Sequence, residues 1–429
     1  MDTTTRQHIE QANLGQAPVP LNCIGPEGLQ FDFNEGVRLW LPPGKWHIRL
    51  LNLDTNTLVT EETNDGGTYA LSEKKYYIRW RIEVRHEQDG PLVLEHDYDA
   101  RDRNVMIYFP VGTIGDSIAW FSFVQAFIDK HQCRATVMMS PFVSCLFEET
   151  YPHITFVGQD TFEGNKQDFY ASYKLGIFWN DVEGQNQPCD FRLVGLHKTA
   201  AYILGVEPND TPPRTTFKGD GDRHPLKGDP YVCISVQATT QCKYWNNPRG
   251  WDEVVAFLKA KGYKVVCIDR GQAYGQGYVL NKMPEGVRDE TGQRPLTERA
   301  WWLEHCAFYI GLSSGISWLA WACRVPTIMI SGFTHPQNEF YTPWRIINYG
   351  VCNSCWNDTR HDFVHDDFMW CPRHKGDIKR HFECSVSISS KMVMDAINNL
   401  EQVEGLTNAS EARLDQRLLP RGGSSHREP

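Results

Sequence analysis

The sequence predicts an α/β protein with two Rossmann-like domains, preceded by a small all-β domain and carrying a segment with four clustered cysteines. Three observations support this fold class. Strand-like segments alone fill the first hundred residues, strands then alternate with helices, and a polar, proline-rich stretch at residues 207–230 divides the alternating part in two. Strands that alternate with helices are typical of a mostly parallel sheet covered by helices.

Composition argues against several classes of protein. The 429 residues carry 43 Lys and Arg against 53 Asp and Glu, a formal charge of −10, so we expect no nucleic-acid partner and no broad attraction to anionic lipid. No stretch approaches the roughly 18 uninterrupted apolar residues of a membrane span, and residues 1–16 lack a signal-peptide pattern. Several of the thirteen cysteines stand singly in apolar segments, as Cys233 and Cys267 do. This placement favours a reducing compartment over a disulfide scaffold.

Residues 1–100 are expected to form the separate all-β domain. Six strand-like runs lie between residues 29 and 99, and turn sequences such as Pro42-Pro43-Gly44 separate them. From Ile78 to Ile82 apolar and charged side chains alternate, which is the period of two of a strand with one buried face.

Residues 101–220 are expected to form the first Rossmann-like domain. The run NVMIYFP at residues 104–110 has the pattern of a buried strand, and a glycine-containing loop connects it to a helix whose apolar residues recur at helical spacing. Residues 221–400 are expected to form the second such domain, including a four-cysteine finger at residues 350–386. A cleft between two domains of this kind holds nucleotides at the carboxyl ends of the strands. Residues 401–429 are polar and are expected to be a disordered tail.

The first candidate site follows the strand at residues 104–110. Gly112, Thr113 and Gly115 form a loop whose small residues let the backbone approach a ligand, and Asp116 stands at the start of the next helix. A carboxylate at this point faces the predicted cleft, where it could take a proton from an attacking hydroxyl. The alternative is that Asp116 only caps its helix.

The second candidate site follows the strand at residues 231–237. The hydroxyls of Thr239 and Thr240 and the ammonium of Lys243 form a plausible cradle for a diphosphate, whose charge builds up as a nucleotide departs. The alternative is that Lys243 is a solvated loop lysine, as most lysines are.

The third candidate site contains Ser313, Ser314 and Gly315, which end one strand and open the next helix. Unpaired N–H groups and the helix dipole favour an anion at such a point, and small residues leave room for it. An N-cap without a ligand is the alternative. The three loops together indicate a site more strongly than any one of them alone.

The fourth candidate site contains Cys352, Cys355, Cys371 and Cys384 in a loop-rich segment with few apolar residues. A C-x-x-C pair followed by two further cysteines suits a tetrahedral metal, and an unligated thiol cluster is the alternative. Tetrathiolate ligation suits zinc as well as iron, and the spacing does not choose between them.

The order of these motifs resembles one known family. GTIGDSIA at residues 112–119, VQATTQCKYW at 236–245, FYIGLSSGISWLAWACRVPTI at 308–328 and the four-cysteine segment are similar to the bacterial autotransporter heptosyltransferases, the TibC-like protein O-heptosyltransferases. These are related to the ADP-heptose transferases of lipopolysaccharide synthesis. The resemblance extends over about residues 20–400, including the β-domain and the cysteine segment.

The resemblance implies a GT-B fold and an inverting transfer of heptose from ADP-heptose to serines of an autotransporter adhesin in the bacterial cytoplasm. It also implies a structural iron bound by the four cysteines and a homo-oligomer, namely a dodecamer. By matching motifs, Asp116 would be the general base, Lys243 would bind phosphate and Thr240 would contact the donor. Where related lipopolysaccharide enzymes have Asp-Thr-Gly, this chain has Ser313-Ser314-Gly315, so the resemblance does not carry donor contacts to this loop.

Two rival functions follow from the same motifs. A lipopolysaccharide-core heptosyltransferase would act on a membrane glycolipid, which the acidic balance and the lack of a basic amphipathic stretch disfavour. A non-catalytic protein would use the β-domain to recognise sugar or protein and the cysteine finger for assembly. Transfer or hydrolysis of the donor would distinguish them.

Overall fold

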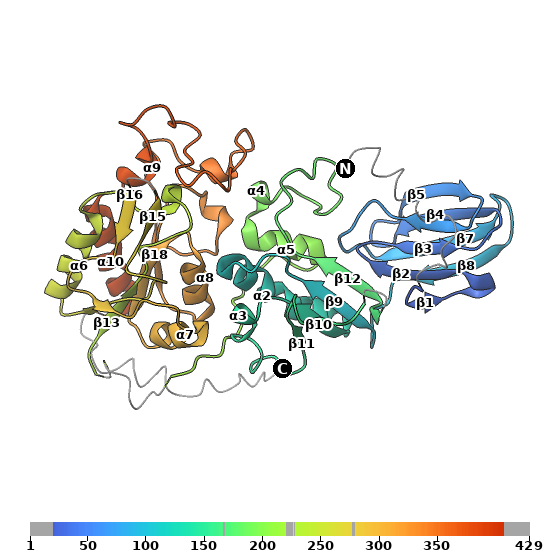
Figure 1. Ribbon diagram of the computed structural model, residues 1–429, viewed down its shortest axis with the longest axis horizontal. Coiled ribbons are helices and arrows are strands. Elements are labelled where there is room, and N and C mark those ends of the chain that lie inside the picture. The colour runs from blue at the N-terminus through green and yellow to red at the C-terminus, as the bar shows by residue number, and fades with distance from the viewer. Residues whose placement is uncertain (1–19, 166–167, 220–225, 227, 277–278, 407–429) are drawn as a thin grey trace, which may run out of the picture.

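The computed structural model describes residues 20–165, 168–219, 226, 228–276 and 279–406 of the chain. These residues form three parts arranged in a row (Figure 1). The N-terminal strands lie at one end, a first α/β domain lies in the middle and a second lies at the other end. Within these ranges, every helix is too short or too polar to cross a membrane.

The N-terminal region consists of short strands in two sheets. Four of its strands form an antiparallel sheet in the order β5-β4-β7-β8. Trp46, Ile48 and Leu50 are buried on one face of β4, as the period of two predicts. The elements are β1 (Cys23–Ile24), η1 (Pro26–Gly28), β2 (Gln30–Asn34), β3 (Arg38–Leu41), β4 (Trp46–Asn52), β5 (Thr57–Asn64), β6 (Thr68–Leu71), β7 (Trp80–His86) and β8 (Leu92–Asp97).

The other strands of this region extend the sheet of the first α/β domain. β2 pairs in parallel with β12 (Ala171–Lys174), and β3 and β6 follow in antiparallel pairing. One eight-stranded sheet in the order β11-β10-β9-β12-β2-β3-β6, with β1 on β2, therefore crosses the expected boundary at residue 100. The prediction of a separate all-β domain is wrong for these strands, because β2 pairs the backbone groups that β12 would otherwise leave at a sheet edge.

The first α/β domain has a parallel sheet of β9, β10, β11 and β12. Its long helix α2 is buried on all sides from Ser117 to Phe121 and packs against α5 and α8. The elements are β9 (Asn104–Tyr108), α2 (Ile114–His131), β10 (Arg134–Met138), α3 (Pro141–Ser144), β11 (Thr155–Val157), β12, α4 (Phe191–Val194) and α5 (Leu196–Leu204).

The second α/β domain has a six-stranded, all-parallel sheet in the order β17-β14-β13-β18-β19-β20. A small hairpin, β15-β16, stands apart from it. The elements are β13 (Tyr231–Ile234), η3 (Gln241–Lys243), α6 (Gly250–Ala260), β14 (Lys264–Cys267), β15 (Ala273–Gln276), β16 (Val279–Lys282), β17 (Arg288–Asp289), α7 (Leu296–Glu304), β18 (Phe308–Leu312), α8 (Gly315–Ala322), β19 (Thr327–Ile330), η4 (Pro336–Asn338), β20 (Arg345–Ile346), η5 (Cys355–Asn357), α9 (Glu383–Val386) and α10 (Ser390–Glu404).

The C-terminal helix α10 continues into the segment expected to be a disordered tail. It packs against α6 and ends at Glu404, so the tail cannot begin at residue 401. Its start is capped by Ser389, whose hydroxyl accepts from the Met392 N–H at 3.3 Å. Residues 407–429 of the expected tail lie outside the described residues.

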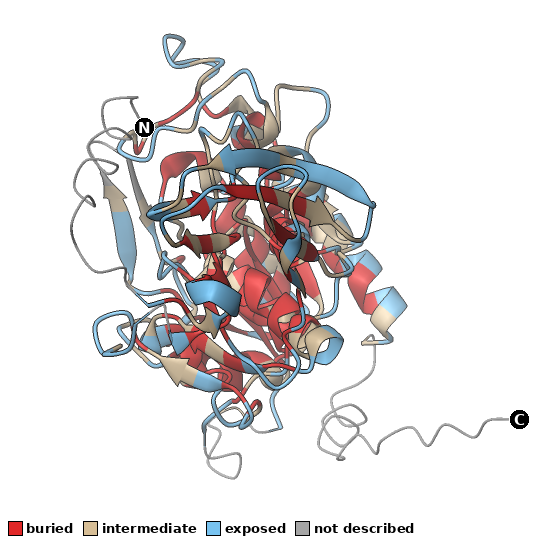
Figure 2. Cartoon of the chain, turned by 90° about the vertical axis from the view of Figure 1, so that its right-hand side faces the viewer, coloured by how far each residue is buried: buried red, intermediate tan, exposed pale blue. Residues whose placement is uncertain are grey.

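Buried apolar side chains form three clusters. One runs without interruption from the N-terminal strands through the first α/β domain to α7 and α8, and a second fills the sheet of the second domain. The third is rich in aromatic rings and cysteines and lies around the cysteine segment. Figure 2 shows buried residues in the interior sheets and helices and exposed residues in the outer loops. The two α/β domains therefore share a core through α2 and α8.

Candidate active site

Three candidate loops follow strands β9, β13 and β18, and two of them meet where the two α/β domains touch. A Cβ added to Gly315 would lie only 2.8 Å from the Ile114 Cβ and 3.1 Å from the Gly115 nitrogen. The starts of α2 and α8 are therefore in direct contact, as their places in Figure 1 also show. Gly112 is exposed, and a Cβ there would make an ordinary contact with Ser140.

Asp116 lies in the first turn of α2. The N-cap residue of this helix is Thr113, so Asp116 is not the N-cap itself but the third residue of the helix. The Thr113 hydroxyl donates to Asp116 Oδ2 at 2.5 Å. Burial raises the pKa of Asp116 above its ordinary value, and the Thr113 hydrogen bond, Lys243 and His365 counteract this in that order. A carboxylate with a raised pKa is a stronger base than a solvated one.

Lys243 approaches Asp116 from the second domain at the end of η3. Its charge lowers the pKa of the Asp116 carboxyl, so the two groups interact electrostatically. Its Nζ lies 5.7 Å from the centre of the Phe333 ring and 5.8 Å from that of Trp356. Over the described ranges, this ammonium has no hydrogen-bond or ion-pair partner. It is therefore available to an anion.

The two threonines of the second loop differ in their surroundings. Thr239 is exposed. Thr240 is buried, and its hydroxyl lies 3.1 Å from the Cys242 sulfur. The Thr239 hydroxyl is therefore free to meet a ligand, whereas that of Thr240 is engaged within the protein.

The third loop rests on a buried ion pair that the sequence did not reveal. Ser313 donates to Glu339 Oε1 at 2.5 Å, and Arg345 donates to Glu339 Oε2 at 2.7 Å. Burial by itself raises the pKa of Glu339. Arg345 and the hydrogen bonds outweigh burial and hold the pKa below its ordinary value, so the carboxylate stays charged. Ser314 is the N-cap residue of α8, and Gly315 is its first residue. The backbone N–H groups at the start of α8 thus border the contact with α2.

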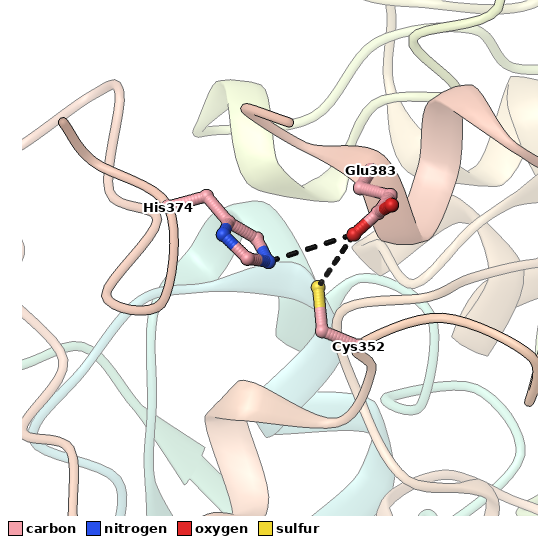
Figure 3. A group of neighbouring side chains, drawn as sticks. All are labelled: Cys352, His374 and Glu383. Carbon is pink, nitrogen blue, oxygen red and sulfur yellow. Dashed lines mark hydrogen bonds and ion pairs between the residues drawn. The ribbon is translucent and has the colours of Figure 1, made fainter. Parts of the chain in front are cut away.

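The cysteine segment, residues 350–386, has little regular structure besides η5 and α9. Cys352 Sγ lies 3.9 Å from Glu383 Oε2, and His374 Nε2 lies 3.5 Å from the same oxygen (Figure 3). In the part of the chain that the structure describes, this is the only group of three or more potential metal ligands whose atoms lie within 4.8 Å of one another. The structure therefore does not gather the four cysteine sulfurs into one ligand set.

The cysteines of this segment nevertheless influence one another electrostatically. Burial raises the pKa of Cys384, and the charges of Cys352, Cys355, Cys371 and Cys242 raise it further. Burial also raises the pKa of Cys355 to about 11. The raised pKa values mean that these thiols hold their protons in the protein alone, and a zinc or iron ion would displace those protons on binding. His374 Nε2 is buried and makes no hydrogen bond, and it lies 3.5 Å from Glu383 Oε2, so both groups are further ligands that a metal site could use.

An aromatic cluster joins the cysteine segment to both domains, and the motif analysis missed it. Trp356 follows Cys355 directly, and its ring centre lies 5.1 Å from that of Trp179 and 5.5 Å from that of Phe333. Trp179 comes from the loop after β12, in the first domain. The signal available in the sequence was the tryptophan beside the C-x-x-C pair, but nothing local indicates its partners.

Two family models match this chain. The N-terminal domain of glycosyltransferase TibC matches residues 25–88, and glycosyltransferase family 9 (heptosyltransferase) matches residues 197–365. The first match covers β2, β3 and β6, which belong to the eight-stranded sheet of the first α/β domain. It also covers β4, β5 and β7, which belong to the separate antiparallel sheet. The second runs from the second residue of α5 through η5, including Lys243 and the loop before α8.

Relatives match over most of the chain. The autotransporter heptosyltransferase Aah of Escherichia coli is 45% identical over 383 residues, which are 89% of this chain and 95% of Aah. The crystal structure of the iron-containing dodecameric glycosyltransferase TibC from enterotoxigenic E. coli superposes with a TM-score of 0.83 at 44% identity, covering 91% of this chain and 100% of TibC. TibC has also been solved in complex with ADP-D-β-D-heptose.

One relative carries a different description. The protein BimC of Burkholderia thailandensis, described as an inactive autotransporter heptosyltransferase, is 38% identical over 88% of this chain and 86% of BimC. Its identity to this chain is lower than that of Aah.

The two α/β domains in contact, the match to family 9 and the relatives above lead to one conclusion. The chain belongs to the autotransporter heptosyltransferases, which are family 9 glycosyltransferases with a GT-B-like fold.

Proposed function

We propose that this heptosyltransferase moves heptose from ADP-heptose to serine hydroxyls of an autotransporter adhesin in the bacterial cytoplasm, with inversion at the anomeric carbon. The names of Aah and TibC support the acceptor class, and the TibC complex supports the donor. The observation that carries the proposal is the contact of α2 with α8, where Asp116 of one domain interacts electrostatically with Lys243 of the other.

Asp116 is the proposed general base. Its carboxylate accepts the proton of the serine hydroxyl while the serine oxygen forms a bond to the anomeric carbon. The bond from that carbon to the diphosphate oxygen breaks on the opposite face, which inverts the configuration. Burial suits Asp116 to this step, because it brings the pKa of the carboxyl closer to the pKa of the serine hydroxyl whose proton is removed.

Lys243 is proposed to neutralise the leaving diphosphate. Negative charge grows on the departing ADP as the carbon–oxygen bond lengthens, and an ammonium placed there stabilises the transition state more than the ground state. Thr239 and the loop of Ser313, Ser314 and Gly315 are proposed as further donor contacts, and so is Thr240, whose hydroxyl would exchange its contact with Cys242 for the donor. Gly112, Thr113 and Gly115 are proposed to border the acceptor. The start of α8 adds backbone N–H donors to the same region.

The cysteine finger is proposed to bind iron through Cys352, Cys355, Cys371 and Cys384, zinc being the other metal that thiolates suit. The other three finger cysteines all raise the pKa of Cys384, as Cys242 also does, which supports a region shared by these thiols. Four thiolates leave a metal no open position, so the metal would supply structure rather than chemistry to the reaction. We propose in addition that the protein forms a homo-oligomer, a dodecamer like TibC.

Co-expression tests the proposed function. The full chain is produced with an autotransporter adhesin in bacteria that make ADP-heptose, and the adhesin is analysed by intact and peptide mass spectrometry. Mass increments of one heptose on serine-containing peptides support the proposal. Heptose found on the lipopolysaccharide core instead would indicate the rival glycolipid acceptor. Bound ADP-heptose with neither product would place the chain beside BimC as an inactive relative, and would contradict the proposal.

A further inference from the structure

We infer that Trp356, together with Phe333, is a positioning residue that holds the Lys243 ammonium ready for the donor diphosphate. This inference rests on the proposed role of Lys243 as the phosphate-binding lysine. It adds a role for the cysteine finger, because Trp356 belongs to the finger and follows Cys355 directly.

The geometry around Lys243 carries the inference. Its Nζ lies 5.7 Å and 5.8 Å from the ring centres of Phe333 and Trp356, within the usual range of a cation–π contact. No other group in the described ranges binds this ammonium. Two aromatic rings therefore supply the contacts that fix the end of a long, flexible side chain.

Trp356 is itself held firmly. It is buried, its indole N–H donates to Asn338 Oδ1 at 3.0 Å, and its backbone N–H donates to the Phe333 carbonyl at 3.2 Å. Its ring also contacts those of Trp179 and Phe191 from the first domain, with centres 5.1 Å and 6.1 Å away. The ring that contacts Lys243 is thus fixed by the finger, by the second domain and by the first domain together.

The contact of Lys243 with the two aromatic rings has a chemical use. Lys243 and Asp116 attract each other, yet no ion pair joins them among the described residues. A direct ion pair would occupy both the base and the phosphate-binding cation. Aromatic faces hold an ammonium without neutralising its charge, so they keep Lys243 available while leaving Asp116 free.

The backbone of the donor loop is tied to the finger as well. The Gln241 N–H donates to the Phe368 carbonyl at 2.9 Å, and Asn246 Nδ2 donates to Ser385 Oγ at 2.8 Å. Both acceptors lie in the cysteine finger. The finger thus fixes the loop on either side of Lys243, and Trp356 fixes its side chain.

The test compares ADP with adenosine, measured by titration calorimetry on the full-length protein. Trp356→Leu should weaken ADP binding by about 3- to 30-fold, the range of a cation–π contact, and should change adenosine binding by less than about twofold. Trp356→Phe should keep most of the ADP affinity, because it retains an aromatic face. Trp370→Leu is the matched control, since Trp370 lies in the same finger and contacts Phe333 but is not among the rings over Lys243. It should affect both ligands equally.

A double-variant cycle separates a positioning role from a structural one. If Trp356 acts through Lys243, adding Trp356→Leu to Lys243→Ala should cause no further loss of ADP affinity. Additive losses, or a Trp356→Leu variant with the ADP affinity of the natural protein, would overturn the inference alone. Lys243→Ala with undiminished ADP affinity would overturn the phosphate role of Lys243 and the inference with it. Should Trp356→Leu fail to fold, Phe333→Leu is subjected to the same cycle with the same expectations.

Discussion

At the scale of single residues, the site depends on a base and a cation that come from different domains. Asp116 is supplied by α2 and Lys243 by η3, and the two lie 127 positions apart by number in the chain. Burial raises the pKa of Asp116, while Thr113 and Lys243 pull it back. The pKa of the carboxyl thus reflects burial, which raises it, and the contacts with Thr113 and Lys243, which lower it. Each of these two contacts can be removed by a single substitution.

The pH dependence of transfer should report this tuning. Only the carboxylate form of Asp116 can act as a base, so activity is lost as the pH falls through its pKa. Because burial raises that pKa, the acid limb of kcat/KM should lie above the ordinary aspartate value of 3.8. Thr113→Val removes the hydrogen bond that stabilises the carboxylate, and should move the acid limb to higher pH. Rate measurements across pH with a limb that does not move would show that Asp116 is not the titrating base.

At the scale of elements, the contact between α2 and α8 determines how closely the candidate loops approach. Ile114 and Gly115 begin one helix, and Gly315 begins the other. The absence of a side chain at position 315 permits the contact. A methyl group there would meet backbone and a branched side chain, neither of which can move easily without moving its helix.

Gly315→Ala should therefore loosen this contact. We expect a loss of about 1–3 kcal/mol in the free energy of unfolding, which is typical of overpacking, and a lower kcat because the loops separate. Denaturant unfolding and transfer assays measure the two effects. Gly376→Ala is the matched control, since a methyl there meets no atom within 4 Å. Equal stability and activity of both variants would mean that the contact between the helices does not set the site.

The cysteine finger is the second element that can be tested alone. Replacing both Cys352 and Cys355 by serine should release about one metal per chain, because the remaining thiols cannot complete a tetrahedral shell. The melting temperature or the oligomer size should fall with it. Elemental analysis identifies iron or zinc, and light scattering reports assembly. Cys23→Ser, which changes a half-buried cysteine far from the finger in sequence, should leave the metal content unchanged.

A finger variant without metal but with unchanged size, melting temperature and activity would contradict its structural role. Loss of activity alone, at unchanged stability and size, would point to a direct effect on the reaction. The contact of Lys243 with Trp356 could transmit such an effect from the finger to the donor site. Comparing the binding of ADP with that of adenosine would detect it.

At the scale of the whole molecule, local patterns predicted most elements. The alternation of strands and helices from residue 104 to residue 331 appears in the structure as two parallel sheets with helices, because hydrophobic periodicity is a local property. The pairing of β2 with β12 was not predictable, since it joins strands more than 130 residues apart. Nothing in either strand indicates a partner at that distance.

Local sequence patterns likewise predicted only some of the residues of the candidate site. The glycine loops and Asp116 could be found from their position after strands, and Lys243 from the loop after β13. The support of Ser313 by Glu339, and the contact of Trp356 with Trp179, depend on side chains that meet only in the folded molecule. The C-x-x-C spacing indicated a metal but could not indicate that His374 and Glu383 lie beside Cys352.

Asp116→Asn tests the central claim most directly. The purified variant and the natural protein are given saturating ADP-heptose and an adhesin fragment, and the initial rate of heptose addition is followed by intact mass. The amide keeps nearly the same shape but cannot accept the proton, so transfer should fall by roughly 10²–10⁴-fold while calorimetry shows nearly unchanged donor binding. Transfer by the variant at more than about a tenth of the natural rate would contradict the assignment of Asp116 as the base.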